Sequence, residues 1–321
     1  MADTVKITLI QAAIDAYLKR TWKYRYIKQF SDPVHYAEPR DPKHQAGPGK
    51  NKLKVLKLNV ADPESTLRHL TEAKWSEWNN LKDANNCRLI FVTRHAKSSH
   101  NKEAEEFGKG IYYRFLARNY DIDNSTRSDP KRDPKLSGGG AKEAEKLGST
   151  LRSMKIPRPE ALYSSPLSRC ISTSILTYQG LNTDGRSLPQ IRVREDLREW
   201  MGWDHYHSSD QRSTKTELKK IFEGKGDLAF LDTFLEQDTF AHDNSKELYL
   251  NVQLRIETIL DEIFADKSNR SVHLFLHGRC FRSFLKAIGS DLFELDNAAT
   301  VVFVVQQEKL SEAEKKTIPK D

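Results

Sequence analysis

The sequence predicts an α/β fold built on a mostly parallel β-sheet. From Cys87 onward, short apolar runs alternate with amphipathic stretches along the chain, and this alternation is typical of strands connected by helices. The chain also has 321 residues and 37% hydrophobic content, which is enough to bury one sizeable core. We therefore expect one main domain with additions.

The apolar runs predict the strands, and the stretches between them predict the helices. The expected strands cover residues 88–93, 160–165, 190–197, 271–277 and 300–306. The expected helices cover residues 138–154, 167–180, 211–222, 245–266 and 279–288. The helix over 245–266 has the clearest pattern, because its apolar residues recur every three or four positions and form one face that can pack on the sheet. These apolar residues are Val252, Ile256, Ile259, Leu260 and Ile263.

Local sequence signals support the starts of two of these helices. The stretch "SGGG" precedes the helix over 138–154; it lacks the Lys-Ser/Thr pair of a P-loop and is interpreted as a helix start. The stretch "SPLSR" precedes the helix over 167–180, and a proline near the first turn is typical of a helix N-terminus.

The chain divides into three parts around these elements. Residues 1–84 form an extension, with helical patterns near 7–29 and 64–82 on either side of a loop that contains Pro and Gly. Residues 85–308 form the main domain, in which 108–137 break the alternation as a partly helical insertion. Residues 309–321 form a charged tail.

The composition excludes several classes of partner. Lys and Arg number 52 against 45 Asp and Glu, a formal charge of +7 that is spread along the chain, so small phosphate-bearing molecules are favoured over nucleic acid. The sequence contains no run of about 18 apolar residues, so it predicts no membrane-spanning helix. Cys87, Cys170 and Cys280 form no disulfide or metal-binding pattern. We expect a protein of the cytoplasm, or of the nucleus, whose oligomeric state stays open.

Charged and imidazole side chains follow four of the expected strands. Arg94 and His95 come after the first strand, Arg169 after the second, Glu199 after the third and His277 after the fourth. Ligands bind at the carboxyl ends of the strands in open α/β sheets, because the loops there converge. The sequence therefore predicts one site that contains two guanidinium groups, two imidazoles and one carboxylate.

This set of side chains suits phosphoryl transfer without a metal or a cofactor. Two guanidinium groups can bind the charged equatorial oxygens of a phosphoryl group in transfer. The same positive charges disfavour protonation of His95, whose imidazole can then attack phosphorus. Glu199 can protonate the departing alkoxide and afterwards activate water. Asp196 is the other acidic residue nearby, but it lies inside the preceding expected strand.

Four segments, "RHAKSSHN", "SSPLSRC", "LRE" and "LHGRCFRSFL", resemble in their order and spacing the signatures of the histidine phosphatase superfamily, in its phosphoglycerate mutase-like branch. The segment "LREWMGWDHYHSSDQRS" further resembles fungal phosphomutase-like phosphatases. The resemblance covers residues from about 85 to 307. It implies a three-layer α/β/α sandwich, with residues 1–84 packed on the core. It also implies a metal-independent phosphomonoesterase that acts on a small phosphorylated metabolite.

The resemblance also implies a role for each matching residue. His95 would be the nucleophile that becomes phosphorylated, and Glu199 the proton donor. The residues implied to hold the phosphate are Arg94, Ser98, Asn101, Arg169, His277 and Gly278. Gly278 stands where the acid-phosphatase branch has an Asp donor, so that branch fits less well. Ala96 departs from the family, which usually has Gly after the nucleophilic histidine; an added methyl group puts the rate in doubt if the backbone there needs positive φ.

Three functions stay open at this point. The first is the phosphatase, the second a phosphomutase that returns the phosphoryl group to another hydroxyl, and the third a phosphatase-like domain that only binds ligands. Residues Trp200, Trp203, His205, Tyr206 and His207 could line the pocket beside Glu199 or could cover the sheet edge. A zinc site formed by His205, His207 and His242 has no supporting spacing.

Overall fold

The structure, a computed structural model, describes residues 22–26, 86–108, 112, 132–182, 189–201, 208–238, 247, 249–290 and 292–309. Seven strands form one sheet in the order β1-β7-β2-β6-β3-β4-β5. They are β1 (Trp22–Tyr26), β2 (Cys87–Arg94), β3 (Ala161–Ser164), β4 (Ile191–Val193), β5 (Leu228–Phe230), β6 (Ser271–Leu276) and β7 (Thr300–Lys309). The five strands from β2 to β5 are parallel, whereas β7 runs antiparallel to both of its neighbours.

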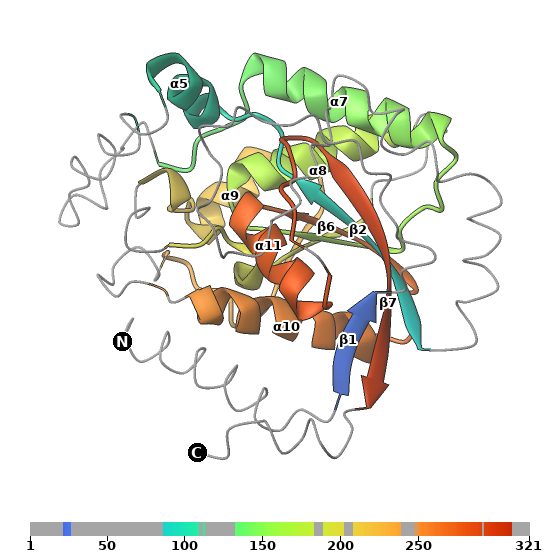
Figure 1. The fold of residues 1–321 in the computed structure, drawn as a ribbon. Helices are drawn as coiled ribbons and strands as arrows, with labels where there is room; N and C mark the ends of the chain where they lie inside the picture. Colours follow the sequence, from blue (N-terminus) through green and yellow to red (C-terminus); the bar gives the residue numbers. More distant parts are fainter. Residues whose placement is uncertain are drawn as a thin grey trace, which may run out of the picture.

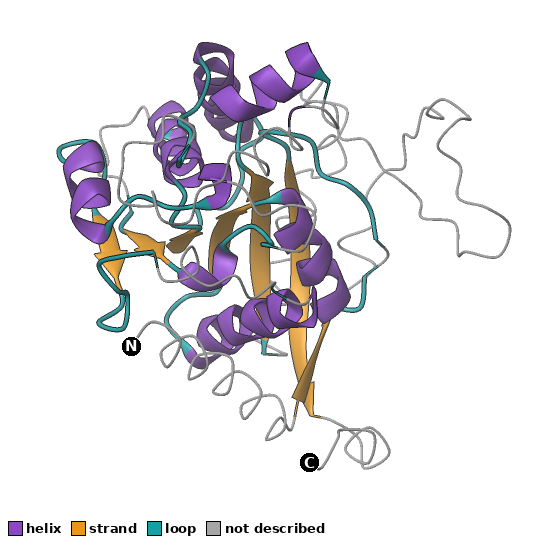
Figure 2. Ribbon diagram, turned by 90° about the vertical axis from the view of Figure 1, so that its left-hand side faces the viewer, coloured by secondary structure: helices purple, strands orange, loops and turns teal. Residues whose placement is uncertain are grey.

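Helices cover both faces of this sheet, which gives the expected three layers (Figure 1). On one face lie α7 (Gly138–Ser153), α8 (Ser168–Leu181) and α9 (Lys215–Phe222). On the other face lie α10 (Tyr249–Ala265) and α11 (Gly278–Ala287). The short helix α5 (Ser99–Phe107) follows β2. Figure 2 shows helices above and below the strands.

Each strand supplies both layers of core because successive side chains point to opposite faces. In β2, Leu89 and Phe91 pack beneath α7, while Ile90 and Val92 pack on the side of α10 and α11. The five apolar residues predicted for the face of α10 are all buried. Burial of each such side chain stabilises the fold by about 1.5–3 kcal/mol, so this face fixes α10 against the sheet.

Most predicted elements match the observed ones to within one to four residues, but the prediction for 190–197 is wrong in part. The strand β4 ends at Val193, and Glu195–Leu197 form a 3₁₀ turn, η3. Leu197 is buried in the cluster that contains Ile256 and Leu260 of α10, so packing on α10 draws the chain out of the sheet. The helix expected from 211 begins at Lys215, and neither α5 nor β5 was expected.

The predicted helix over 7–29 is wrong at Trp22–Tyr26, which form β1. This strand pairs antiparallel with the end of β7, with Trp22 opposite Lys309 and Tyr26 opposite Val305. The stretch "WKYRY" alternates aromatic and basic residues, a two-residue period that favours a strand when a partner edge is available. The remaining expected elements of 1–84, most of the 108–137 insertion and the tail after 309 lie outside the described residues.

Contact between α7 and α8 depends on two glycines. A Cβ atom at Gly148 would overlap the backbone carbonyl of Thr177, and one at Gly180 would lie 2.7 Å from the carbonyl oxygen of Glu145. We expect Gly148→Ala to lower the free energy of unfolding by about 3 kcal/mol, because added volume in a packed contact forces the backbone to shift. Chemical denaturation measures this change.

Gly139→Ala is the matched control for that substitution. It lies in the first turn of the same helix, and its added Cβ would meet no atom nearer than Ser137 Oγ at 3.9 Å. Its stability should stay unchanged or rise by up to about 1 kcal/mol, because alanine favours helix over glycine. Equal stabilities of the two variants would contradict the close packing of α7 on α8.

Among the residues described, no helix has both the length and the apolar character needed to cross a bilayer.

Candidate active site

The carboxyl ends of three adjacent strands bring four of the predicted catalytic residues together. Strand β6 lies between β2 and β3, so residues distant in sequence meet there. The backbone N–H of His95, directly after β2, donates to the carbonyl of Leu276 at the end of β6 (3.0 Å). The ring centroids of His95 and His277 are 5.0 Å apart. Arg94 ends β2, and Arg169 lies in the first turn of α8, after β3.

The hydrogen bond of His95 defines which of its nitrogens can react. Its side chain is only 3% exposed, and Nδ1 lies 2.9 Å from the carbonyl oxygen of Ala96. A carbonyl oxygen only accepts hydrogen bonds, so Nδ1 carries the proton and Nε2 of the neutral ring keeps its lone pair. The backbone carbonyl of His95 accepts from the side chain of Asn297 (2.8 Å). Nε2 is therefore the nitrogen whose lone pair a predicted nucleophile would use.

Two effects keep this imidazole neutral. Burial lowers the pKa of His95 well below its ordinary value, and the positive charges of Arg169 and Arg94 lower it further. The carbonyl of Ala96 opposes these effects only in part. Because the pKa of His95 lies well below 6.5, the imidazole is unprotonated at neutral pH. It also keeps its lone pair when the pH falls to 6.5, the ordinary pKa of histidine.

Both arginines beside His95 have an unused donor. Nη1 of Arg94 donates to the carbonyl of Leu295 (2.9 Å), and Nη1 of Arg169 donates to that of Ser209 (2.7 Å). Within the described part of the chain, the buried Nε of Arg94 and the buried Nε of Arg169 have no acceptor. A buried donor without an acceptor costs about 1–3 kcal/mol. Both Nε–H groups can therefore donate to an acceptor that the described chain does not supply.

His277 is the N-cap residue of α11, and its ring is held in place from two sides. Its Nε2 lies 2.8 Å from Ser165 Oγ and 3.3 Å from Cys170 Sγ, while its Nδ1 lies 3.5 Å from Nη2 of Arg169. Burial lowers the pKa of His277 well below its usual value, and Arg169 and His95 add to this effect. The ring is therefore neutral and fixed beside His95.

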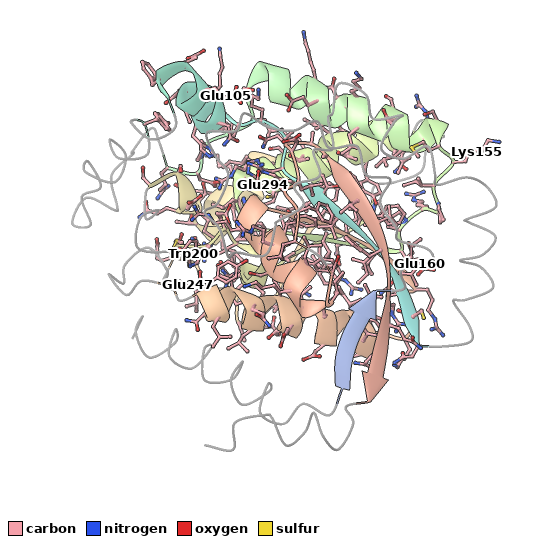
Figure 3. All side chains as sticks on the ribbon, in the orientation of Figure 1. Glu105, Lys155, Glu160, Trp200, Glu247 and Glu294 are labelled. Carbon is pink, nitrogen blue, oxygen red and sulfur yellow. The ribbon has the colours of Figure 1, made fainter. Side chains whose placement is uncertain are left out.

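Glu199 lies near enough to Arg169 of this cluster for the two charges to interact. Its Oε1 accepts from the backbone N–H of Trp200 (2.9 Å). Burial raises the pKa of its carboxyl, the negative charge of Asp210 raises it further, and Arg279 and Arg169 oppose the rise. Figure 3 places Trp200 beside Glu247, whose carbonyl accepts from the indole Nε1 (2.8 Å). The structure thus holds a carboxyl of raised pKa near the arginine of α8.

Asp196, the other acid considered, faces a different group. Burial raises its pKa to about 6, and the charge of Arg255 opposes the rise. The guanidinium of Arg255 donates to the backbone carbonyl of Asp196 (2.6 Å) and forms a two-bond pair with Glu247. Asp196 is therefore associated with α10, whereas Glu199 is associated with Arg169.

Ser98 and Asn101 are engaged at the start of α5. The backbone N–H and the hydroxyl of Ser98 both donate to Oδ1 of Asn101 (3.3 and 2.8 Å). The buried ring of His100 completes the group, with Nδ1 2.7 Å from Ser98 Oγ and Nε2 3.1 Å from Asn101 Nδ2. These contacts cap the helix. Phosphate contact by Ser98 and Asn101 stays a prediction.

Gly278 begins α11 directly after His277, and its backbone lies against Arg94. A Cβ atom there would be 3.6 Å from Nε of Arg94, which is ordinary van der Waals contact. The structure therefore shows proximity to the predicted phosphate-binding arginine without a strict steric need for glycine. A role in phosphate binding stays a prediction for this residue.

The methyl group of Ala96 fits into a small apolar cluster. Ala96 is buried and packs with Ala144 and Ala298. Its backbone N–H donates to Thr173 Oγ1 (3.0 Å). The backbone angle φ of Ala96 is not positive. By contrast, Ala298 has a φ of 54°, and its N–H donates to the carbonyl of Arg94. The alanine after His95 therefore causes no strain of the kind that glycine would relieve.

The start of α7 holds the loop that follows Ala96. The carbonyl of Lys97 accepts from both the backbone N–H and the hydroxyl of Ser137 (3.0 and 2.9 Å). The backbone N–H of Lys97 donates to the carboxylate of Glu143 (3.0 Å). A Cβ at Gly140 would overlap the backbone of Lys97. The "SGGG" stretch is thus the helix start that was expected, and its third glycine permits the close approach.

Sequence reasoning missed several residues that support the site. They are Ser165, Thr173, Asp210 and Asn297. Ser165 and Asp210 lie within segments that carried the resemblance, so their position was a usable signal. Thr173 and Asn297 had no such signal, because their contacts to the loop around His95 join segments that only the fold brings together.

The remaining residues considered in the sequence analysis add no catalytic or metal-binding group to the described part of the site. Cys170 and Cys280 are free and buried, and burial raises the pKa of each thiol, so neither is an activated nucleophile. Among the described residues no cluster of three or more His, Cys, Asp or Glu could hold a metal ion. The other residues considered, Trp203, His205, Tyr206, His207 and His242, lie outside the described residues.

The sequence model of the histidine phosphatase superfamily (branch 1) matches residues 121–314, more than half of the chain. The chain belongs to this superfamily. The matched range begins after His95, so the position of the segment around His95 comes from the structure, where β2 lies between β7 and β6 of the matched range.

Two curated proteins from fungi are similar in sequence. A probable phosphoglycerate mutase of Arthroderma benhamiae is 27% identical over 240 residues, 73% of this chain and 68% of that protein. Phosphomutase-like protein 3 of Candida albicans is 25% identical over 224 residues, 69% of this chain and 66% of that protein. The chain thus aligns with about two thirds of the length of each relative.

Two solved structures are also similar to this chain. A phosphoglycerate mutase from Bacillus anthracis str. Sterne has 19% identity and a TM-score of 0.45, covering 75% of this chain and 98% of that one. The ecdysone phosphate phosphatase from Bombix mori has 17% identity and a TM-score of 0.43, covering 70% and 92% of the two chains.

Proposed function

We propose that the protein is a metal-independent phosphomonoesterase that acts on a small phosphorylated metabolite through a phosphohistidine intermediate. One observation carries the proposal: a buried neutral imidazole at His95 lies near two arginines, Arg94 and Arg169, whose buried Nε–H groups lack acceptors in the described chain. A phosphoryl group beside Nε2 of His95 would satisfy both donors. Membership in the histidine phosphatase superfamily supports this function.

In the first half-reaction, Nε2 of His95 attacks phosphorus and the bond between phosphorus and the alcohol oxygen breaks. Arg94 and Arg169 bind the equatorial oxygens, where negative charge is concentrated. The neutral ring of His277, which lies beside His95, would contact the phosphoryl group. Protonated Glu199 gives its proton to the leaving oxygen. The products are the free alcohol and phosphohistidine.

In the second half-reaction, water replaces the alcohol. Glu199, now a carboxylate, takes a proton from the water as its oxygen attacks phosphorus and the phosphorus–nitrogen bond breaks. Inorganic phosphate leaves, His95 regains its lone pair, and Glu199 is again protonated. The positive N-terminal ends of α8 and α11 lie at Arg169 and His277, where they favour the anion in both steps.

Rapid quenching with a labelled substrate panel tests the proposal. Radioactive phosphate from a substrate should appear on the protein within one turnover, should survive alkali, and should be lost in acid, because phosphohistidine is acid-labile. The rate of label formation across the panel reports the preferred substrate. A protein that binds the phosphate esters but never becomes labelled would be a ligand-binding module and would contradict the enzymatic proposal.

A phosphomutase is the second candidate, and the names of the two fungal relatives favour it. Both reactions share the first half-reaction and differ in the acceptor of the phosphoryl group. Incubation with a phosphoglycerate should release inorganic phosphate if water is the acceptor, and should yield the isomeric phosphoglycerate if a substrate hydroxyl is. Exclusion of water would favour the mutase.

We also propose a reducing compartment, the cytoplasm or the nucleus. The three cysteines are free and buried, which fits an environment where disulfides are rare. The proposed partner is the small phosphorylated substrate, and we propose no nucleic-acid, membrane or cofactor partner.

A further inference from the structure

Asp210 is a buried carboxylate that the steps above do not use. It lies in a short 3₁₀ turn, η4 (Ser208–Asp210), and is 3% exposed. Its Oδ1 accepts from Nη2 of Arg169 at 2.7 Å, and the carbonyl of the preceding Ser209 accepts from Nη1 at 2.7 Å. Consecutive residues of one turn therefore hold both terminal nitrogens of this guanidinium.

This grip determines how Arg169 faces a ligand. A guanidinium is planar, so fixing both terminal nitrogens fixes the plane and the direction of the third N–H group. That third group, Nε–H, is buried and has no acceptor in the described chain. Asp210 and Ser209 thus leave Nε as the edge of Arg169 that is offered to an anion, while the carboxylate compensates part of the buried positive charge.

The same turn is linked to Glu199 through the neighbouring residue Arg198, whose side chain contacts the backbone of the turn. Arg198, the residue before Glu199, donates to the carbonyl of Asp210 (2.8 Å) and forms a two-bond pair with Asp238 (2.6 and 2.8 Å). Asp238 also accepts from the backbone N–H of Arg212 (2.8 Å). The turn, the acid and the arginine of α8 therefore form one connected unit, in which a change at Asp210 reaches both Arg169 and Glu199.

Asp210 also acts on Glu199 through space. After burial, its negative charge is the largest factor that raises the pKa of the Glu199 carboxyl. Other groups face Glu199 from the elements packed around it: Arg279 and Cys280 of α11, Tyr249 of α10, and Arg169 and Cys170 of α8. Of the charged groups named here, Asp210 is the one that shares the negative sign of ionised Glu199.

We propose that Asp210 is a positioning residue for the proposed reaction, which orients Arg169 toward the phosphoryl group and places a negative charge near Glu199. The inference rests on the proposed function. Asp210 itself touches neither the phosphoryl group nor the alcohol in this scheme; it acts through the two residues that do.

Asp210→Asn tests the proposal, because asparagine keeps the Oδ1 acceptor and removes the charge. The readout is kcat/KM against pH for two substrates, p-nitrophenyl phosphate, whose leaving group needs no acid, and glycerol phosphate, whose alkoxide does. Glu199 must be protonated to act, so activity on glycerol phosphate falls as the pH rises through its pKa. Loss of Asp210 removes a charge that raises this pKa, so the fall should begin at a lower pH than in the wild type. Activity on p-nitrophenyl phosphate should show no such shift.

Asp238→Asn is the matched control, since it removes another buried carboxylate of the same network, paired with Arg198 instead of Arg169. It should lower the melting temperature without moving the alkaline fall. If Asp210→Asn lowers activity equally on both substrates with no pH shift, Asp210 is merely structural and the inference is overturned.

Asp210→Glu keeps the test informative if Asp210→Asn does not fold. This variant keeps the charge and moves the carboxylate, so the alkaline fall should stay at the wild-type pH while kcat/KM drops for both substrates. A shifted fall in Asp210→Glu would contradict the electrostatic part. Failure of the proposed function would be seen separately, as the absence of a phosphohistidine label on the wild-type protein.

Discussion

His95→Asn is expected to lower kcat by about 10⁴-fold or more, because the variant has no nitrogen lone pair with which to attack phosphorus. Asparagine keeps an N–H donor that can reach the carbonyl of Ala96, the acceptor of Nδ1 in the native protein, and so tests the chemistry with little change of packing. Neither p-nitrophenyl phosphate nor an alkyl phosphate should be turned over. Rapid-quench labelling should find no phosphorylated protein.

His273→Gln is the control for loss of a buried imidazole. His273 lies in β6 and contacts Thr93 and Tyr178 away from the arginines, so its replacement should lower stability and still permit labelling. Label on His95→Asn would refute the assignment of the nucleophile. Because the pKa of His95 lies well below 6.5, the wild type should also still form the labelled species when the pH falls below that value.

The effect of Glu199→Gln on the reaction rate is expected to depend on the leaving group of the substrate. With an alkyl phosphate, kcat should fall by about 10²–10⁴-fold, because the alkoxide leaves without its proton donor. With p-nitrophenyl phosphate the first half-reaction should stay fast and the second should become slow, since no carboxylate activates water. Stopped-flow absorbance should therefore show a burst of about one p-nitrophenolate per protein, followed by slow turnover.

Asp196→Asn is the control for that experiment. Asp196 is also an acid of raised pKa in the same stretch, but it is associated with Arg255. Its replacement should produce no burst and no dependence on the leaving group. The same burst in both variants, or a burst in neither, would contradict the assignment of Glu199 as the acid and base of the reaction.

The arginines show why the site favours a bound anion. Within the described chain, Nη1 of Arg94 and both terminal nitrogens of Arg169 donate to protein acceptors, and each arginine leaves a buried Nε–H unsatisfied near the neutral ring of His95. A phosphoryl group supplies acceptors to donors that are already fixed in direction, so little reorganisation accompanies its binding. This preorganisation depends on residues such as Asp210 and Leu295, which hold the other nitrogens.

The sequence alone determined the order of the main elements and the residues that end the strands. Hydrophobic periodicity is a local property, and it located β2, β6 and α10 to within a few residues. Arg94, His95, Arg169 and His277 could also be named in advance, because polar side chains directly after apolar strands have few structural reasons to be there. Their presence at one site followed from the rule that parallel strands end at the same edge.

Only the tertiary structure decided which strands are neighbours and which groups surround each side chain. The insertion of β6 between β2 and β3 sets the distance between His95 and His277, and strand order is a long-range property that periodicity does not contain. The pairing of Asp210 with Arg169, and the neutral state of His95, depend on burial and on charges from separate elements. The strand at Trp22–Tyr26 likewise required the exposed edge of β7, because a short alternating segment takes its conformation from the partner that it finds.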